Sequence, residues 1–167
     1  MGMRWHIVAG STGAGKSTFA RELAERVGGV RFSIDEWMTA LYWMDSPEKN
    51  DLPWAMERIA RCEEQIAVVA ISLAAVDVDV VLDLGFTLRE HRASWLKRAQ
   101  AAGITVELHV LDVPAEVRWQ RVCERNRGGD TFSFEVTRPM FDFMEARWEL
   151  PSAEELATFA SSESAVA

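Results

Sequence analysis

The 167-residue sequence has only 5 prolines and 2 cysteines, and no long hydrophobic run. The two cysteines, Cys62 and Cys123, have no paired spacing, so neither a disulfide framework nor a cysteine metal site is predicted. No segment approaches the roughly 18 apolar residues that a membrane helix needs, and the amino terminus lacks the pattern of a signal peptide. We therefore expect a cytoplasmic protein that has no contact with a membrane.

The sequence also has fewer basic than acidic residues. The chain has 18 Lys and Arg residues against 26 Asp and Glu, a formal net charge of -8, which disfavours non-specific adhesion to nucleic acid. With 49% hydrophobic and 26% charged residues, the composition is that of a globular protein and excludes disorder or a fibre. Without a repeat or a linker, the sequence predicts one domain over residues 1–160 and a frayed tail over 161–167.

Short apolar runs alternate with segments of helical periodicity along the chain. The expected strands are residues 5–9, 30–34, 79–84 and 105–111, and the expected helices are residues 17–27, 36–44, 54–76, 88–102, 114–127 and 138–148. Such alternation predicts an α/β fold, with a parallel sheet covered by helices on both faces. In this class the ligand site lies at the carboxyl ends of the strands.

A glycine-rich loop joins the first expected strand to the first helix and matches G-x-x-x-x-G-K-[ST] in full. The predicted phosphate-binding residues are Gly10, Ser11, Thr12, Gly13, Ala14, Gly15, Lys16, Ser17 and Thr18. We expect Lys16 to reach the β- and γ-phosphates and Ser17 to ligate Mg²⁺. The alternative is a chance turn before a helix, and the flanking strand and helix favour nucleoside triphosphate binding instead.

Two carboxylates stand at strand ends. Asp83 closes an apolar strand, which is typical of the acid that holds Mg²⁺ or its water shell; a solvated aspartate is the alternative. Asp35 follows the second strand, where it either accepts a proton from an attacking hydroxyl or caps the helix that follows.

Four arginines lie in one expected helix that leads into Gly128. Arg118, Arg121 and Arg125 are three and four residues apart and so share a face. They are either a solvated basic stripe or part of a lid that closes on the γ-phosphate, with Arg127 beside it.

Large aromatic side chains gather just after Asp35. Trp37, Trp43 and Trp54 either belong to the core or line a pocket for a flat or apolar acceptor. Basic residues are few in this stretch, which disfavours a nucleic-acid partner.

Taken together, the phosphate loop, Asp35, Asp83-Leu84-Gly85-Phe86 with Arg89 and Arg92, and Arg121-x-x-x-Arg125-Asn126 resemble the small P-loop kinases. These are the kinases related to zeta toxins, chloramphenicol phosphotransferase, gluconate kinase and the polynucleotide 5′-kinase domain. The similarity covers about residues 5–150. It implies a three-layer P-loop NTPase fold with four to five strands in the order 2-3-1-4 and a helical lid.

On the nucleotide side, the resemblance implies that Lys16 and Ser17 serve the phosphates and Mg²⁺ and that Asp83 belongs to the metal shell. Arg121 and Arg125 are implied to act from the lid in ATP binding and catalysis.

On the acceptor side, the resemblance implies that Asp35 is catalytic and that Arg89 and Arg92 face the acceptor. The chain departs from the pattern at residues 149–167, where no fifth strand is evident.

The leading hypothesis is an enzyme that uses ATP and Mg²⁺ to phosphorylate a hydroxyl of a small molecule, such as an antibiotic or a metabolite. Nucleoside, nucleotide or polynucleotide 5′-hydroxyl kinases are the nearer alternative. A nucleotide-binding switch protein without a second substrate is an alternative of another class.

Overall fold

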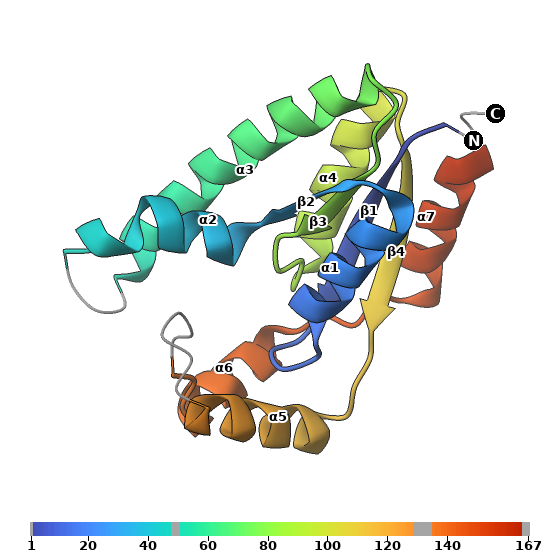
Figure 1. The fold of residues 1–167 in the computed structure, drawn as a ribbon. Helices are drawn as coiled ribbons and strands as arrows, with labels where there is room; N and C mark the ends of the chain where they lie inside the picture. The colour runs from blue at the N-terminus through green and yellow to red at the C-terminus, as the bar shows by residue number, and fades with distance from the viewer. Residues whose placement is uncertain (1, 48–50, 129–134, 165–167) are drawn as a thin grey trace.

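The computed structural model describes residues 2–47, 51–128 and 135–164, in which helices cover both faces of a central sheet (Figure 1). The elements in chain order are β1 (Arg4–Gly10), α1 (Lys16–Val27), β2 (Val30–Ser33), α2 (Ile34–Leu41), a 3₁₀ helix η1 (Trp43–Asp45), α3 (Leu52–Ala74), β3 (Val80–Asp83), α4 (Arg89–Ala101), β4 (Thr105–Leu111), α5 (Ala115–Arg127), α6 (Arg138–Arg147) and α7 (Ala153–Ser164). The strands are parallel and ordered β2-β3-β1-β4. The predicted α/β class and strand order are therefore confirmed.

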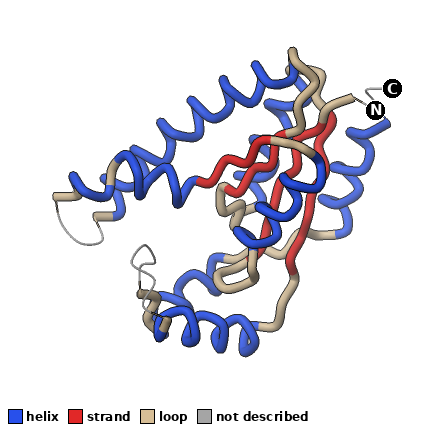
Figure 2. Tube along the Cα trace, in the orientation of Figure 1, coloured by secondary structure: helices blue, strands red, loops and turns tan. Residues whose placement is uncertain are grey.

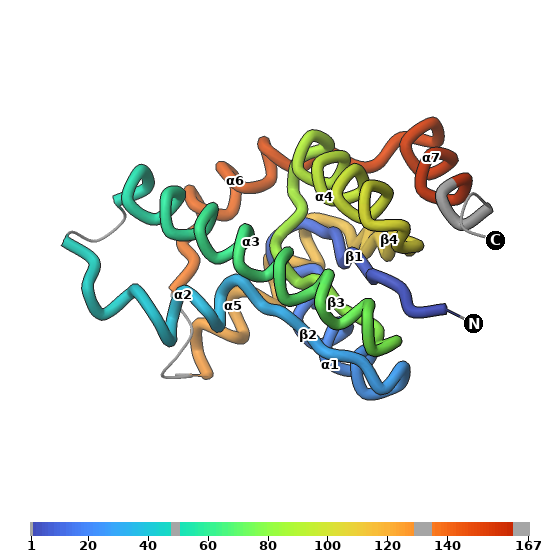
Figure 3. Tube along the Cα trace, turned by 90° about the horizontal axis from the view of Figure 1, so that it is seen from above, coloured from blue at the N-terminus to red at the C-terminus, as the bar shows by residue number. Residues whose placement is uncertain are grey.

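Alternate residues of β1 pack against the two helical layers. Trp5 and Ile7 are completely buried in the larger core, to which α3, α4 and α7 contribute. Val8 faces the other way and packs with Leu23 of α1 in a smaller core. Figures 2 and 3 show this arrangement, with α1 and α4 on opposite sides of the strands. Because β1 and β3 are covered on both faces, their sequences are almost wholly apolar.

The end of α1 follows the glycine signal in the sequence. Gly28 adopts φ +66°, a left-handed conformation that glycine enters without a steric penalty. The N–H of Gly29 then donates to the carbonyl oxygen of Ala24 at 2.9 Å. A Cβ on Gly29 would lie 2.6 Å from the carbonyl oxygen of Asp79, so only glycine allows the close approach of β2 to the chain entering β3.

The single helix expected over residues 36–44 is instead two elements. Helix α2 begins earlier, at Ile34, because the Ser33 hydroxyl accepts the N–H of Glu36 at 3.4 Å. It ends where Tyr42 turns to φ −135°, and the short helix η1 follows. Ser33, and not Asp35, is therefore the N-cap.

Helix α7 is not anticipated by the sequence patterns. It packs against β4, and the described part of the chain forms four strands with no fifth one after α5. Residues 161–164 of the tail expected to fray form the end of α7, while 165–167 lie outside the described residues, so fraying stays a prediction.

A buried ion pair attaches α7 to the rest of the protein. Arg92 of α4 is fully buried, and its Nε and Nη2 atoms donate to the two carboxylate oxygens of Glu155 at 2.6 and 3.0 Å. Its Nη1 atom also donates to the carbonyl oxygen of Phe86 at 3.0 Å, in the loop after β3. One guanidinium thus holds α4, α7 and that loop together.

We predict that Glu155→Ala lowers the free energy of unfolding by about 3–5 kcal/mol, because it leaves the Arg92 charge buried without a partner. Urea unfolding followed by circular dichroism measures this change. The neighbouring Glu154 is a matched control, since its side chain is 82% exposed and contacts Arg89 of α4 at a distance of 3.7 Å. Equal effects of Glu154→Ala and Glu155→Ala would contradict the prediction.

Candidate active site

The phosphate loop runs from the end of β1 into α1 in a conformation that its glycines permit. Gly13 and Gly15 adopt φ +79° and +90°, and the Ala14 N–H donates to the Ser11 carbonyl oxygen at 3.2 Å. A Cβ on Gly13 would lie 2.6 Å from the carbonyl oxygen of Arg118. The loop therefore lies directly against the backbone of α5, which a larger residue at position 13 would prevent.

The amino terminus of α1 offers unpaired N–H groups to an anion. Gly15 is the N-cap and provides no side-chain hydrogen bond, and the first turn of α1 contains no acidic residue. Free N–H groups and the positive end of the helix dipole form an anion site. Lys16 begins this helix, and its Nζ donates to the carbonyl oxygen of Ser11 at 3.1 Å, so its ammonium lies over the loop.

Asp83 ends β3 as predicted and is almost completely buried, with 5% of its surface exposed. Its Oδ2 accepts a hydrogen bond from Nη2 of Arg31 at 3.0 Å, and Nη1 of the same arginine donates to Glu36 at 2.9 Å. Arg31 is a site residue that sequence reasoning missed. Its signal was a basic residue within a short strand that is otherwise mostly apolar, two positions before the strand ends.

The carboxylate of Asp35 lies near Lys16, Asp83 and Arg125, although these residues are far apart in the sequence. The residue is exposed overall, but protein atoms surround its carboxyl group and displace much of its water. This desolvation, and next the charge of Asp83, raise the pKa of Asp35 above its ordinary value of 3.8, against the opposing effect of nearby cations. Among the described residues, no hydrogen bond to this carboxylate is found, so it remains available to a ligand.

The ammonium of Lys16 is surrounded by groups that shift its pKa in opposite directions. Burial lowers the pKa of its ammonium, Asp83 and Asp35 oppose that effect, and Arg118 and Arg125 add to it. Three cations and two carboxylates from four elements thus act on one another at the carboxyl edge of the sheet.

The arginines of α5 divide into two kinds. Arg118 is buried, and it donates to the carbonyl oxygen of Thr12 at 3.1 Å and to Glu145 of α6 at 2.6 Å. Glu145 also accepts the hydroxyl of Ser11 at 2.9 Å. Arg118 therefore joins the phosphate loop to α5 and α6, and is neither part of a solvated stripe nor free to move with a lid.

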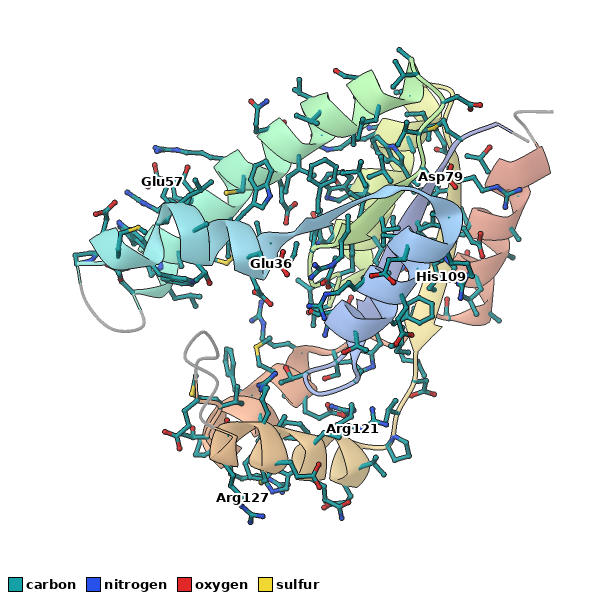
Figure 4. All side chains as sticks on the ribbon, viewed as in Figure 1. Glu36, Glu57, Asp79, His109, Arg121 and Arg127 are labelled. Carbon is teal, nitrogen blue, oxygen red and sulfur yellow. The ribbon has the colours of Figure 1, made fainter. Side chains whose placement is uncertain are left out.

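Arg121 and Arg125 lie further along α5 and are exposed. Nη1 of Arg121 is 3.4 Å from the carbonyl oxygen of Ala14, and Figure 4 shows Arg121 on α5 facing the loop. Arg125 acts electrostatically on both Lys16 and Asp35. Both side chains are placed to approach a phosphate on the loop; closure of a lid stays a prediction, since residues 129–134 lie outside the described part of the chain.

The three tryptophans do not form one cluster. Trp37 packs edge-on against Phe32 at a ring distance of 6.0 Å and borders the core. Trp43 is 44% exposed, and its ring lies 5.9 Å from that of Trp54, over which the Arg58 guanidinium sits at 4.1 Å. Trp43 and Trp54 are thus the partly accessible aromatic pair, where α3 begins.

The expected acceptor role of Arg92 does not agree with its position. Its guanidinium is buried against Glu155 and the loop after β3, so it has no access to an acceptor. Arg89 also faces the carboxyl-terminal segment, because its N–H donates to Glu149 at 2.6 Å and its Nη2 lies 3.7 Å from Glu154. Spacing alone could not reveal these partners, which come from α7 and from the segment that precedes it.

The donor set at the edge of the sheet fits Mg²⁺ and a nucleoside triphosphate. Ser17 in the first turn of α1 and Asp83 offer a hydroxyl and a carboxylate, the oxygen ligands that Mg²⁺ prefers. The uncapped amino terminus of α1 and Lys16 suit phosphate oxygens.

A family model described as an AAA domain, AAA_33, matches residues 6–151. No curated protein matches the sequence. Among the described residues, no helix is both long and apolar enough to cross a bilayer.

Solved structures share the fold at low sequence identity. A chain of the Pnkp1/Rnl/Hen1 RNA repair complex has a TM-score of 0.66 and 17% identity over 98% of this chain, which spans 46% of that longer one. A gluconokinase from Sinorhizobium meliloti 1021 has a TM-score of 0.60 and 18% identity, with 98% and 90% of the two chains covered. The Mycobacterium tuberculosis APS kinase CysC, in complex with AMPPNP and APS, has a TM-score of 0.60 and 17% identity, with 99% and 96% covered.

We predict that Asp35→Asn raises the melting temperature of the ligand-free protein at neutral pH. Because the pKa of Asp35 is raised on folding, its charged form opposes folding, and this opposition develops as the pH rises through the folded pKa. Asparagine cannot ionise. Differential scanning fluorimetry across pH measures the effect, which should shrink as the pH falls toward 3.8 and Asp35 becomes protonated. A variant less stable than the wild type at neutral pH would contradict it.

Proposed function

The chain belongs to the AAA_33 family of AAA domains and has the fold of the small P-loop kinases, and from this we propose that it transfers the γ-phosphate of ATP, with Mg²⁺, to a hydroxyl of a small molecule. The observation that carries the proposal is the Asp35 carboxylate. It stands without a hydrogen bond among the described residues, close to the phosphate-loop lysine and to Asp83. A desolvated carboxylate at this place is typical of a general base and favours phosphoryl transfer over nucleotide binding alone.

The nucleotide side rests on α1 and α5. The first N–H groups of α1 and the Lys16 ammonium bind the β- and γ-phosphate oxygens, while Arg121 and Arg125 approach from α5 as charge develops. Ser17 and Asp83 would hold Mg²⁺, which when bound would supply positive charge to neutralise the phosphate oxygens.

Arg31 positions Asp83. Its hydrogen bond to Oδ2 leaves the other carboxylate oxygen, Oδ1, for the metal shell. Its Nη1 atom donates to Glu36 and so fixes the start of α2, where Asp35 lies. One arginine thereby sets the relative positions of the two carboxylates.

Asp35 is the general base of the reaction. It accepts the proton of the acceptor hydroxyl while that oxygen attacks the γ-phosphorus and the bond to the bridging oxygen breaks, which releases ADP. The raised pKa makes Asp35 a stronger base than an ordinary aspartate. The base must be ionised, so turnover should fall as the pH drops through this raised pKa.

The acceptor is proposed to bind beside the accessible tryptophan pair at the start of α3. Trp43 and Trp54 present partly exposed rings beyond α2, with Arg58 stacked over one of them. Aromatic faces beside one cation suit a flat or apolar molecule with a hydroxyl better than a bare polyol. Trp37 supports α2 from the core side.

A second candidate is a nucleoside, nucleotide or polynucleotide 5′-hydroxyl acceptor. The likeness to a chain of an RNA repair complex favours it, and aromatic faces also stack on bases. Against a long anionic strand, Arg58 over Trp54 and Arg61 further along α3 are both paired with Glu57, and the chain carries a net charge of -8.

The experiment is release of ADP from Mg-ATP, screened over separate pools of hydroxyl-bearing antibiotics and metabolites, of nucleosides and nucleotides, and of 5′-hydroxyl oligonucleotides. We expect one small-molecule pool to raise release above the rate with water alone. Stimulation by oligonucleotides only would favour the second candidate. ATP binding with no stimulation by any pool would count against a kinase and favour a nucleotide-dependent switch.

With an active pool in hand, Asp35→Asn should lower kcat by about 10²–10⁴-fold, because the hydroxyl proton loses its acceptor. The Kd of ATP should be unchanged or lower, since a negative charge near the phosphates is removed. Glu25→Gln, an exposed carboxylate-to-amide change in the second half of α1, is the matched control and should turn over as the wild type does. Full activity of Asp35→Asn would refute the assignment of the base.

A further inference from the structure

A second group of ligand-type side chains lies between β1 and β4, apart from the phosphate loop. Parallel pairing places His6 opposite Glu107 and Val8 opposite His109, so the two histidines and the glutamate share the face of the sheet that α1 covers. Because β4 is an edge strand, the group extends from the interior to the surface. The exposed side-chain fractions are 5% for His6, 16% for His109 and 39% for Glu107.

The donor atoms of these three residues already have the spacing of a metal site. Nδ1 of His6 lies 3.1 Å from Nε2 of His109. The Glu107 carboxylate faces both rings, with Oε2 at 3.6 Å from His6 Nδ1 and Oε1 at 3.6 Å from His109 Nε2. Ligands bound tetrahedrally at about 2.0–2.1 Å from Zn²⁺ are about 3.3 Å apart, so an ion fits at the centre with small movements.

A carboxylate behind His6 orients its ring. Nε2 of His6 lies 3.4 Å from Oδ2 of Asp79, and Oδ1 of Asp79 accepts the N–H of Arg4 at 2.7 Å, which fixes the carboxylate. A proton on Nε2 directed at Asp79 leaves the lone pair of Nδ1 directed at Glu107 and His109. Histidines that bind metals commonly have such a carboxylate on the other nitrogen.

We propose that His6, His109 and Glu107 bind a divalent transition-metal ion, of which Zn²⁺ is the expected one. Water is the fourth ligand, and Asp79 positions the His6 ring through its contact with Nε2. Two imidazoles select Zn²⁺, or Co²⁺ as its spectroscopic substitute, over Mg²⁺, which prefers oxygen ligands.

The site is separate from phosphoryl transfer. Asp79 precedes β3, at the amino ends of the strands, whereas the phosphate loop follows the carboxyl end of β1; Figure 4 shows Asp79 and Arg121 at opposite ends of the sheet. The ion joins the edge strand β4 to β1, and the His109 ring packs 5.4 Å from that of Phe19 on α1. Its effect is therefore to stabilise the edge of the sheet.

The test uses untagged full-length protein treated with EDTA and then dialysed free of the chelator. Titration with Co²⁺ should produce visible absorption bands of a tetrahedral site, and calorimetry with Zn²⁺ should give one ion per chain. At free Zn²⁺ about 100-fold above Kd, the melting temperature should rise by about 5–10 °C. Absence of both the bands and the thermal shift would overturn the proposal.

Variants locate the ion. His109→Ala and Glu107→Gln each remove a ligand near the surface and should abolish the Co²⁺ bands. Asp79→Asn keeps all three ligands and should weaken Zn²⁺ binding by about 10–100-fold, a loss that a merely structural role of Asp79 would not produce. Glu116→Gln, on the exposed start of α5, is the matched control and should bind as the wild type does.

Two further variants exclude other sites. Cys123→Ser removes a thiol that could take up Zn²⁺, and Ser17→Ala removes the hydroxyl assigned to Mg²⁺. Both should retain the Co²⁺ spectrum. Loss of the spectrum in Cys123→Ser or Ser17→Ala, with retention in His109→Ala, would refute the site. None of these measurements requires an acceptor, so the outcome is independent of the kinase proposal.

Discussion

The contact between the phosphate loop and α5 is the constraint on which the site depends. Because Gly13 has no side chain, the loop lies against the carbonyl oxygen of Arg118, and the guanidinium of that residue returns to the loop at Thr12. Glu145 completes the network by binding both Arg118 and Ser11. The loop, α5 and α6 are therefore one packed unit, and Arg121 of α5 is held beside the loop where phosphate binding is predicted.

The second feature is the density of charge at the carboxyl edge of the sheet. Asp35 and Asp83 repel each other, and Lys16 is drawn into a buried position between them and the arginines of α5. Such an arrangement costs stability in the ligand-free protein, and a bound triphosphate and cation offset part of it. The shifted pKa values of Asp35 and Lys16 agree with the phosphoryl transfer proposed for this site.

The remaining polar groups of the interior have other partners. Arg92 is committed to Glu155, which fastens α7 onto the core, and His6 and Asp79 face the amino half of the sheet. The proposed catalytic site, the attachment of the carboxyl-terminal helix and the inferred metal site therefore occupy separate parts of the molecule. A change in one of them should leave the other two in place.

The sequence by itself determined the α/β class, the phosphate loop and the carboxylates at the strand ends, because these depend on local periodicity and on residues consecutive in the chain. It left open whether Asp35 caps a helix, and it placed Arg92 on the acceptor side. Tertiary structure decided these points, because Ser33 caps α2 and because α7 brings Glu155 to Arg92 from 63 residues away. The pairing of His6 with His109 across 103 residues likewise depends on strand register, which no local pattern specifies.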